Sequence, residues 1–260
     1  MSATAPSAPR SRRGRGLRRA VVVLVVLLVL LGVGAVVADG ILRSYAQDRV
    51  AGDIESQLPE GVDGGVDVTI GGASVILQYL SGSFERVHLE GDRLTVNGTP
   101  LDADIVATGV PIDRTRPVER AVGTFGIDEA AVTDLLAAST DAPADVRIGD
   151  GVVEYSAPLE FLGLDLSYDV TAEPRIDGGT VVFTPTAATL SAGSGSFDVG
   201  GLLGSDRLAS FAFPVCAAQY LPRGVSLTDL ELAPGRVMVD VAASSLRLDG
   251  DSFSTVGSCG

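Results

Sequence analysis

The chain has 260 residues, of which 46% are hydrophobic and 20% charged, as in a globular protein with a sizeable core. All 19 basic residues are Arg, and six of them lie in residues 1–20, which contain no acidic residue. Residues 21–260 contain the other 13 Arg and all 33 Asp and Glu, so their net charge is −20. A domain this acidic repels phosphate, which excludes a nucleic-acid partner and leaves apolar burial as the main route to lipid. The Arg-only, Ala- and Gly-rich composition indicates a GC-rich genome, as in actinobacteria.

The N-terminus has the pattern of a membrane anchor. Residues 1–19 are rich in Ser, Pro, Gly and Arg and predict a disordered basic tail, whereas residues 20–38 are uncharged and mostly Val and Leu. The positive-inside rule then predicts a single-pass protein of the cell membrane, with a cytoplasmic N-terminus and residues 39–260 forming an extracytoplasmic (periplasmic or cell-envelope) domain. The alternative is a cleaved signal peptide that ends at Ala38.

The first part of the domain mixes helices and strands. From Asp39 to Leu58 apolar residues recur every three or four positions, which predicts a helix that continues the anchor and stops at Pro59. Residues 66–70 and 84–89 alternate as strands, and residues 73–80 between them suit one or two helical turns. Asn97-Gly98 is a strong signal for a tight hairpin between two further strands.

The second part is mostly strands. The two prolines in residues 109–118 indicate a crossing loop, and residues 127–138 predict a helix with Asp128 as its cap. From Val146 onward alternating segments separated by Gly-rich turns predict strands, the last pair joined across Pro234-Gly235. The fold class is therefore α+β, with an N-terminal membrane helix, an antiparallel sheet and one or two further helices.

Cys216 and Cys259 are the only cysteines, and an even pair in an exported domain predicts a disulfide. Two unpaired thiols are the alternative. A catalytic cysteine is disfavoured because His88 is the only histidine available to activate a thiolate.

Catalytic and metal-binding motifs are missing from the sequence. There is no phosphate-binding loop, no nucleophile elbow around Ser194 and Ser196, and no spacing of metal ligands. His88 lies in an alternating strand, and Asp102 and Asp104 share one strand face, where solvated charges explain them. We therefore predict that the protein is not an enzyme and needs no cofactor or metal.

Several segments together resemble the LmeA family of actinobacterial phospholipid-binding proteins. The matching pieces, in the same order, are the basic tail and anchor, Leu58-Pro59, Gly71-Gly72, the run from Leu77 to Gly82 with Phe84, the run from Leu221 to Leu230, and Gly235-Arg236-Val237. The resemblance covers about residues 40–248. It implies an envelope protein that binds phospholipid and supports lipid or lipoglycan assembly. It also implies a tubular lipid-binding-like fold, in which an elongated, curved antiparallel sheet wraps on one or two helices.

Candidate lipid contacts are the apolar residues of two helical segments, whose alternative role is ordinary core: Val75, Ile76, Leu77, Tyr79, Leu80, Phe84, Val132, Leu135 and Leu136. The expected partners are a phospholipid or other envelope lipid and the membrane itself, through residues 20–38. The competing function is a structural adaptor that stabilises a membrane-bound envelope enzyme and binds no lipid.

Overall fold

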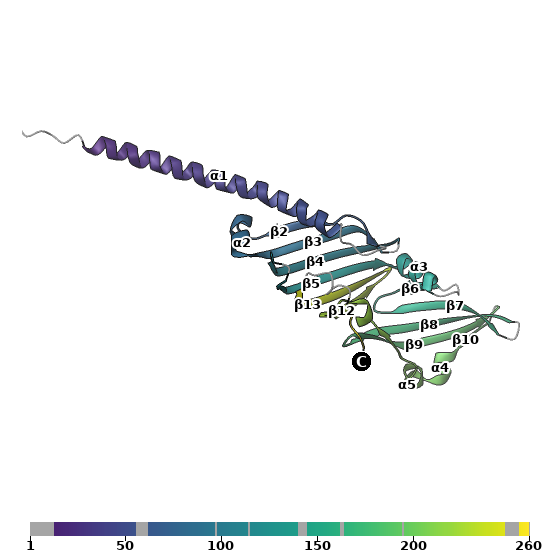
Figure 1. The fold of residues 1–260 in the computed structure, drawn as a ribbon. Helices are drawn as coiled ribbons and strands as arrows, with labels where there is room; N and C mark the ends of the chain where they lie inside the picture. The colour runs from purple at the N-terminus through teal and green to yellow at the C-terminus, as the bar shows by residue number, and fades with distance from the viewer. Residues whose placement is uncertain are drawn as a thin grey trace, which may run out of the picture. The chain divides into compact units, whose positions relative to one another are not determined.

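The computed structural model describes residues 13–55, 62–96, 98–113, 115–139, 145–161, 164–193, 195–247 and 255–259. The chain divides into two compact units, residues 1–45 and 46–260, which are described separately. Figure 1 shows the helices and strands along the chain. The α+β class is confirmed, with an apolar N-terminal helix and two antiparallel sheets where the sequence suggested one.

The described residues of the first unit form the first part of helix α1 (Arg13–Glu55), which continues without a break into the second unit, as the periodicity predicted. The helix starts inside the segment for which a disordered tail was expected. Large apolar side chains from Leu24 to Val37 are all more than half exposed. Within the described residues this is the one helix long and apolar enough to cross a membrane, a test that a signal sequence also passes.

The first sheet of the second unit contains seven strands among the described residues. Its order is β1-β3-β4-β5-β13-β12, and β2 pairs with β3 beside β1. The strands are β1 (Val62–Asp63), β2 (Asp67–Gly71), β3 (Ser83–Val96), β4 (Thr99–Pro111), β5 (Pro117–Asp128), β12 (Val225–Ala233) and β13 (Arg236–Arg247). The predicted hairpin joins β3 to β4, and residues 109–118 belong to a second hairpin instead of the expected crossing loop, because β4 pairs directly with β5.

The second sheet lies between β5 and β12 in the sequence. Its order is β10-β9-β8-β7-β6, with β11 also paired to β9. The strands are β6 (Asp145–Ile148), β7 (Val153–Phe161), β8 (Leu164–Asp177), β9 (Thr180–Ala192), β10 (Gly195–Asp198) and β11 (Phe213–Cys216). The short helices α4 (Val199–Leu203) and α5 (Ser205–Ala209) connect β10 to β11, and a 3₁₀ turn, η1 (Ala218–Tyr220), follows.

The two sheets meet at a small core. Val146 and Ile148 of β6 are almost completely buried with Leu232 of β12, and Val132 of helix α3 (Glu129–Ser139) packs against them. Glu129 links α3 to β6, because its carboxylate accepts a hydrogen bond of 2.7 Å from the Ile148 amide. The sequence did not predict this contact. Asp128, the predicted cap, instead forms an ion pair with Arg236 at 3.4 Å.

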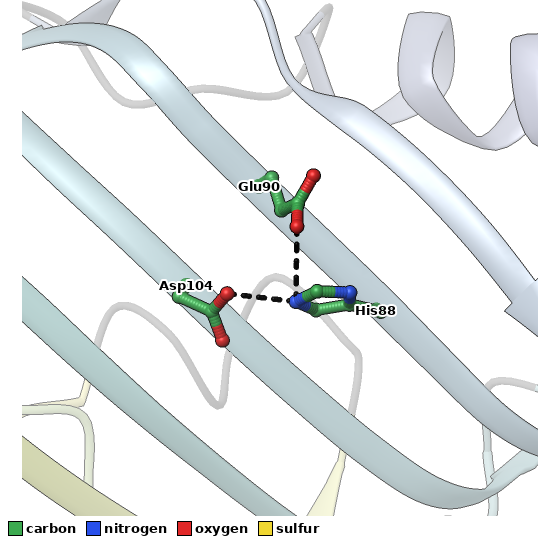
Figure 2. A group of neighbouring side chains, drawn as sticks. All are labelled: His88, Glu90 and Asp104. Carbon is green, nitrogen blue, oxygen red and sulfur yellow. Dashed lines mark hydrogen bonds and ion pairs between the residues drawn. The ribbon is translucent and has the colours of Figure 1, made fainter.

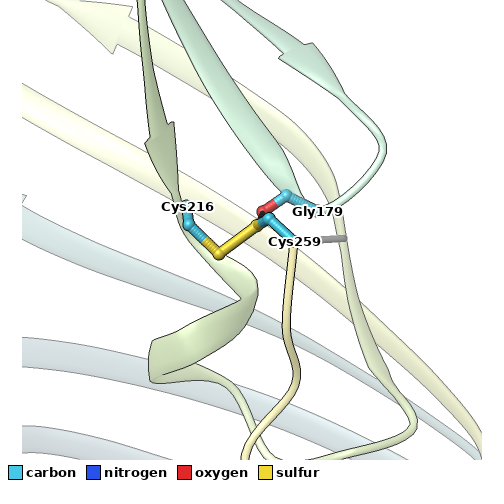
Figure 3. Close-up of a disulfide and its surroundings, with 3 residues drawn as sticks. All are labelled: Gly179, Cys216 and Cys259. Carbon is cyan, nitrogen blue, oxygen red and sulfur yellow. Dashed lines mark hydrogen bonds between the residues drawn. A yellow bond between two sulfur atoms is a disulfide. The ribbon is translucent and has the colours of Figure 1, made fainter.

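The disulfide predicted between Cys216 and Cys259 is present (Figure 3). It ties the C-terminal segment to β11 of the second sheet, and Gly179 lies beside the bond. The same segment is held by backbone hydrogen bonds from Arg223 to Thr255 (2.8 Å) and from Gly257 to Leu221 (3.0 Å). The C-terminal residues 255–259 are therefore fixed to β11 and to residues 221–223 by covalent and polar contacts.

Candidate functional site

Helix α2 (Val75–Ser81) forms where the sequence predicted a helical turn. Ser74 caps its N-terminus and accepts a hydrogen bond of 3.3 Å from the Leu77 amide. Gly82 ends the helix in the left-handed conformation (φ 83°), which glycine adopts without a steric cost. The helix is only seven residues long, so its stability must come from contacts outside it.

Those contacts are polar and centre on Gln78, the one buried polar side chain among the described residues, at 4% exposure. Its amide nitrogen donates to the Gly71 carbonyl at 3.0 Å, and its amide oxygen accepts from the Glu85 backbone at 2.8 Å. At the C-terminal end of the helix, Arg116 donates to the Gly82 carbonyl at 2.6 Å. Helix α2 is thus fixed to β2 and β3 by its polar residues.

The apolar residues of α2 lie on the outside. Leu77, Tyr79 and Leu80 are 66%, 63% and 76% exposed, whereas Val75 is buried at 3%. A single exposed leucine is common on protein surfaces, but three large exposed apolar side chains on a seven-residue helix form a patch that indicates a binding surface. We refer to Leu77, Tyr79 and Leu80 as the α2 patch.

The first sheet has one apolar face. Residues directly opposite each other across a sheet share a face, and the row Val68, Leu89, Ile105, Gly123, Val241 and Leu227 crosses it without a polar side chain. Leu89, Ile105 and Val241 are only partly buried. The described residues therefore leave some of this apolar face accessible.

The nine predicted lipid contacts fall into separate groups. Leu77, Tyr79 and Leu80 form the α2 patch, with Ile76 and Phe84 partly buried beside it and Val75 in the core. Val132 of α3 packs in the junction between the sheets. Leu135 and Leu136 lie in α3, but their side chains are outside the described part of the structure.

The opposite face of the first sheet is polar and strongly acidic. A row of directly opposed residues there contains five carboxylates and one hydroxyl: Asp67, Glu90, Asp104, Thr124, Asp240 and Asp229. Arg236 binds Asp102 at 2.5 Å, and this hydrogen bond raises the pKa of the guanidinium. Hollows of about 250 and 370 Å³ lie on this face.

His88, which the sequence places in an alternating strand, lies in β3 beside the acidic row (Figure 2). Its Nε2 is 2.8 Å from Oδ2 of Asp104 and 3.6 Å from Oε1 of Glu90. The sequence pattern placed His88 and Glu90 on one face of a strand but did not show what lies opposite. The spacing of metal ligands that the sequence lacks is produced here by strand pairing.

The sequence analysis did not predict a second group of exposed apolar residues, because its members come from several short elements. Phe197, Leu202, Phe211 and Phe213 are 56%, 69%, 63% and 49% exposed, and they lie in or beside β10, α4 and β11. Phe213 stacks on Phe183, with ring centroids 5.2 Å apart. We call these four exposed residues the α4 patch.

Fold and surface together define a β-rich domain of two antiparallel sheets with apolar surface left accessible, preceded by a long apolar helix. The chain belongs to the LmeA-like phospholipid-binding family, whose model matches residues 37–242 and so confirms the resemblance seen in the sequence. No curated protein and no solved structure shows a significant match.

Proposed function

We propose that this is a membrane-anchored protein of the cell envelope that binds phospholipid through the α2 patch and the apolar face of the first sheet. Membership of a phospholipid-binding family supports a lipid ligand. The observation that carries the proposal further is the exposure of Leu77, Tyr79 and Leu80 on a helix held by polar contacts. The role is binding without catalysis, in support of envelope lipid or lipoglycan assembly.

Apolar burial supplies the driving force for this contact. Moving a Leu side chain from water into an apolar medium contributes roughly 1.5–3 kcal/mol, so the three residues of the α2 patch suffice for a reversible lipid contact. The Gln78 side chain bonds the backbone of β2 at Gly71 and of β3 at Glu85, which holds α2 in place while the patch faces outward. The protein then recognises the acyl chain of the lipid, because a domain with a net charge of −20 repels an anionic head group.

Anchoring through residues 20–38 fits this role. The apolar part of α1 presents uncharged side chains along a length suited to a bilayer, and six Arg precede it. An anchored domain meets lipid at a high local concentration, so a weak contact with each lipid is enough.

The alternative function, an adaptor that stabilises a membrane enzyme without a lipid ligand, is favoured by the α4 patch. Exposed aromatic residues are typical of protein–protein contacts, and Phe197, Phe211 and Phe213 supply three. The two functions predict different contacts for the α2 patch, which makes them separable.

The test uses the full chain reconstituted into phosphatidylethanolamine and phosphatidylglycerol vesicles. A small fraction of the phospholipid carries a photoreactive group at the end of one acyl chain, and the crosslinked residues are mapped by mass spectrometry. We expect labels on residues 75–84 and on the apolar face of the first sheet in addition to residues 20–38. Labels confined to residues 20–38 in a folded protein would contradict lipid binding by the domain and favour the adaptor.

A further inference from the structure

His88, Glu90 and Asp104 bring three potential metal-ligand atoms together on the polar face of the first sheet. The His88 Nε2, a Glu90 oxygen and an Asp104 oxygen all lie within 4.8 Å of one another. Figure 2 shows the imidazole nitrogen directed between the two carboxylates. His88 and Glu90 are two residues apart on β3, and Asp104 is the residue directly opposite Glu90 on β4.

The charges around this cluster favour a bound cation. Like charges directly opposite each other on neighbouring strands destabilise a sheet, and Glu90 has Asp67 on one side and Asp104 on the other. The nearby Arg236 is already paired with Asp102 and Asp128, at 2.5 and 3.4 Å. Among the described residues, the only ion pairs of Glu90 and Asp104 are with His88. A divalent cation held between the two carboxylates would offset the repulsion that remains between them.

The donor set also indicates the kind of cation. Imidazole nitrogen suits first-row transition metals and zinc, and carboxylate oxygens are shared by zinc and manganese, whereas calcium and magnesium prefer oxygen alone. Bonds of about 2.0–2.2 Å in a tetrahedron place the donors about 3.4 Å apart. The observed distances of 2.8 and 3.6 Å from Nε2 to the two carboxylates lie on either side of that value.

Space for the remaining ligands is available. Glu90 and Asp104 line the hollow of about 250 Å³ on this face, together with Asp102 and Thr124. Because two of the three protein ligands line this open hollow, at least one position remains for water, as in an accessible zinc site and unlike a closed structural one.

We propose that His88, Glu90 and Asp104 form a binding site for a divalent transition-metal cation, with zinc as the best fit. The cation crosslinks β3 and β4 on the face of the sheet opposite its apolar face. The site is independent of lipid binding, so failure of one proposal leaves the other standing.

The experiment titrates the metal-free full chain, in detergent micelles, with Zn²⁺ by isothermal calorimetry. We expect one Zn²⁺ per chain in the micromolar range, because all three ligands are partly exposed. Glu90→Gln, Asp104→Asn and His88→Ala each remove one ligand and should weaken binding at least tenfold. Glu173→Gln makes the same charge change at an exposed position of β8 and should leave binding unchanged.

A second readout identifies the ligands directly. X-ray absorption at the zinc edge should show one imidazole and three oxygen neighbours, two from carboxylates and one from water, at about 2.0–2.1 Å. Binding weaker than millimolar would overturn the proposal. So would binding that survives all three ligand substitutions. The amide-for-carboxylate changes keep side-chain shape, so thermal unfolding of these two variants without zinc checks that the fold is intact.

Discussion

At the scale of single residues, a substitution in the α2 patch distinguishes a lipid-contacting role of its residues from a role in the core. Leu80 is 76% exposed, so Leu80→Asp should change the free energy of unfolding by less than about 0.5 kcal/mol. The same change places a charge where an acyl chain would lie, and we expect acyl-chain crosslinking of residues 75–84 to fall severalfold. Thermal unfolding and crosslinking, measured on one preparation, check both statements.

The control for that variant is Leu202→Asp, because Leu202 is 69% exposed in the α4 patch. It introduces the same charge in place of the same residue and should leave crosslinking of residues 75–84 unchanged. If Leu80→Asp unfolds the domain, the core role is correct for this residue and the α2 patch is not a lipid surface.

Gln78 carries the second residue-scale prediction. Gln78→Met removes both of its hydrogen bonds and leaves the Gly71 carbonyl and the Glu85 amide without this partner. We expect a loss of about 1–3 kcal/mol in the free energy of unfolding, measured with denaturant. Gln219→Met, at an exposed position of η1, is the matched control and should lose far less. Equal losses would show that Gln78 does not fix α2.

At the scale of elements, the turn between β4 and β5 contains Arg116, which donates a hydrogen bond to the C-terminal end of α2 at Gly82. The Thr115 hydroxyl and amide both donate to the Asp113 carboxylate, at 2.8 and 3.0 Å, and Arg116 follows immediately. These bonds, the hydroxyl first, hold the pKa of Asp113 below its ordinary value. A lowered folded-state pKa means that this contribution to stability is present above the unfolded pKa and is lost as pH falls through the folded one.

Thr115→Val removes the larger of the two causes, so the pKa of Asp113 should rise toward its ordinary value. A carboxyl-carbon NMR titration measures it directly. Arg116→Met, which removes a weaker charge effect, should raise the pKa of Asp113 less. The opposite order would show that charge, and not hydrogen bonding, sets this pKa.

The disulfide supports the edge of the second sheet. It closes a loop between residues 43 apart in sequence, which the chain-entropy model values at roughly 4 kcal/mol. We expect Cys216→Ser with Cys259→Ser to lower the Tm by several degrees, and reduction of the wild-type chain to do the same. An unchanged Tm after verified reduction would mean that the backbone bonds at Arg223 and Gly257 suffice.

At the scale of the whole molecule, charge makes a prediction about salt. A domain at −20 with an apolar contact surface gains no attraction from anionic lipid. Raising salt from low to about 0.5 M should therefore leave acyl-chain crosslinking unchanged or increase it slightly, because salt screens the repulsion. A fall of tenfold or more would indicate head-group recognition by Arg side chains.

Local patterns predicted the elements better than they predicted their pairing. Helix α2, the hairpin at Gly98 and the pairing of β12 with β13 follow from short-range signals. Extending the hairpin register from Val96 and Thr99 pairs Glu90 with Ile105, but a bulge between Gly91 and Leu94 shifts the register and pairs Glu90 with Asp104. The cluster at His88 was hidden from the sequence for this reason.

The division into two sheets was also beyond local patterns. β5 pairs with β13, so that Asp128 lies opposite Arg236, 108 residues later in the chain. Which apolar residues are exposed could not be predicted either, because Val75 and Leu77 look alike in an apolar run, whereas in the structure Val75 is buried with Gln78 and Leu77 is exposed. Of the nine apolar residues, Val75 is buried and Val132 packs against the core at the junction of the sheets.

The insertion of the second sheet between β5 and β13 sets an order of events during biosynthesis. At about 5–20 residues per second, the ribosome needs roughly 5–20 s to make the 108 residues from Asp128 to Arg236. For that time β5 presents an unpaired edge to the surrounding chains, and nascent protein requires a holding factor or export in an unfolded state. The arrival of β13 then covers the edge of β5, and the shorter β12 becomes the edge strand of the finished sheet.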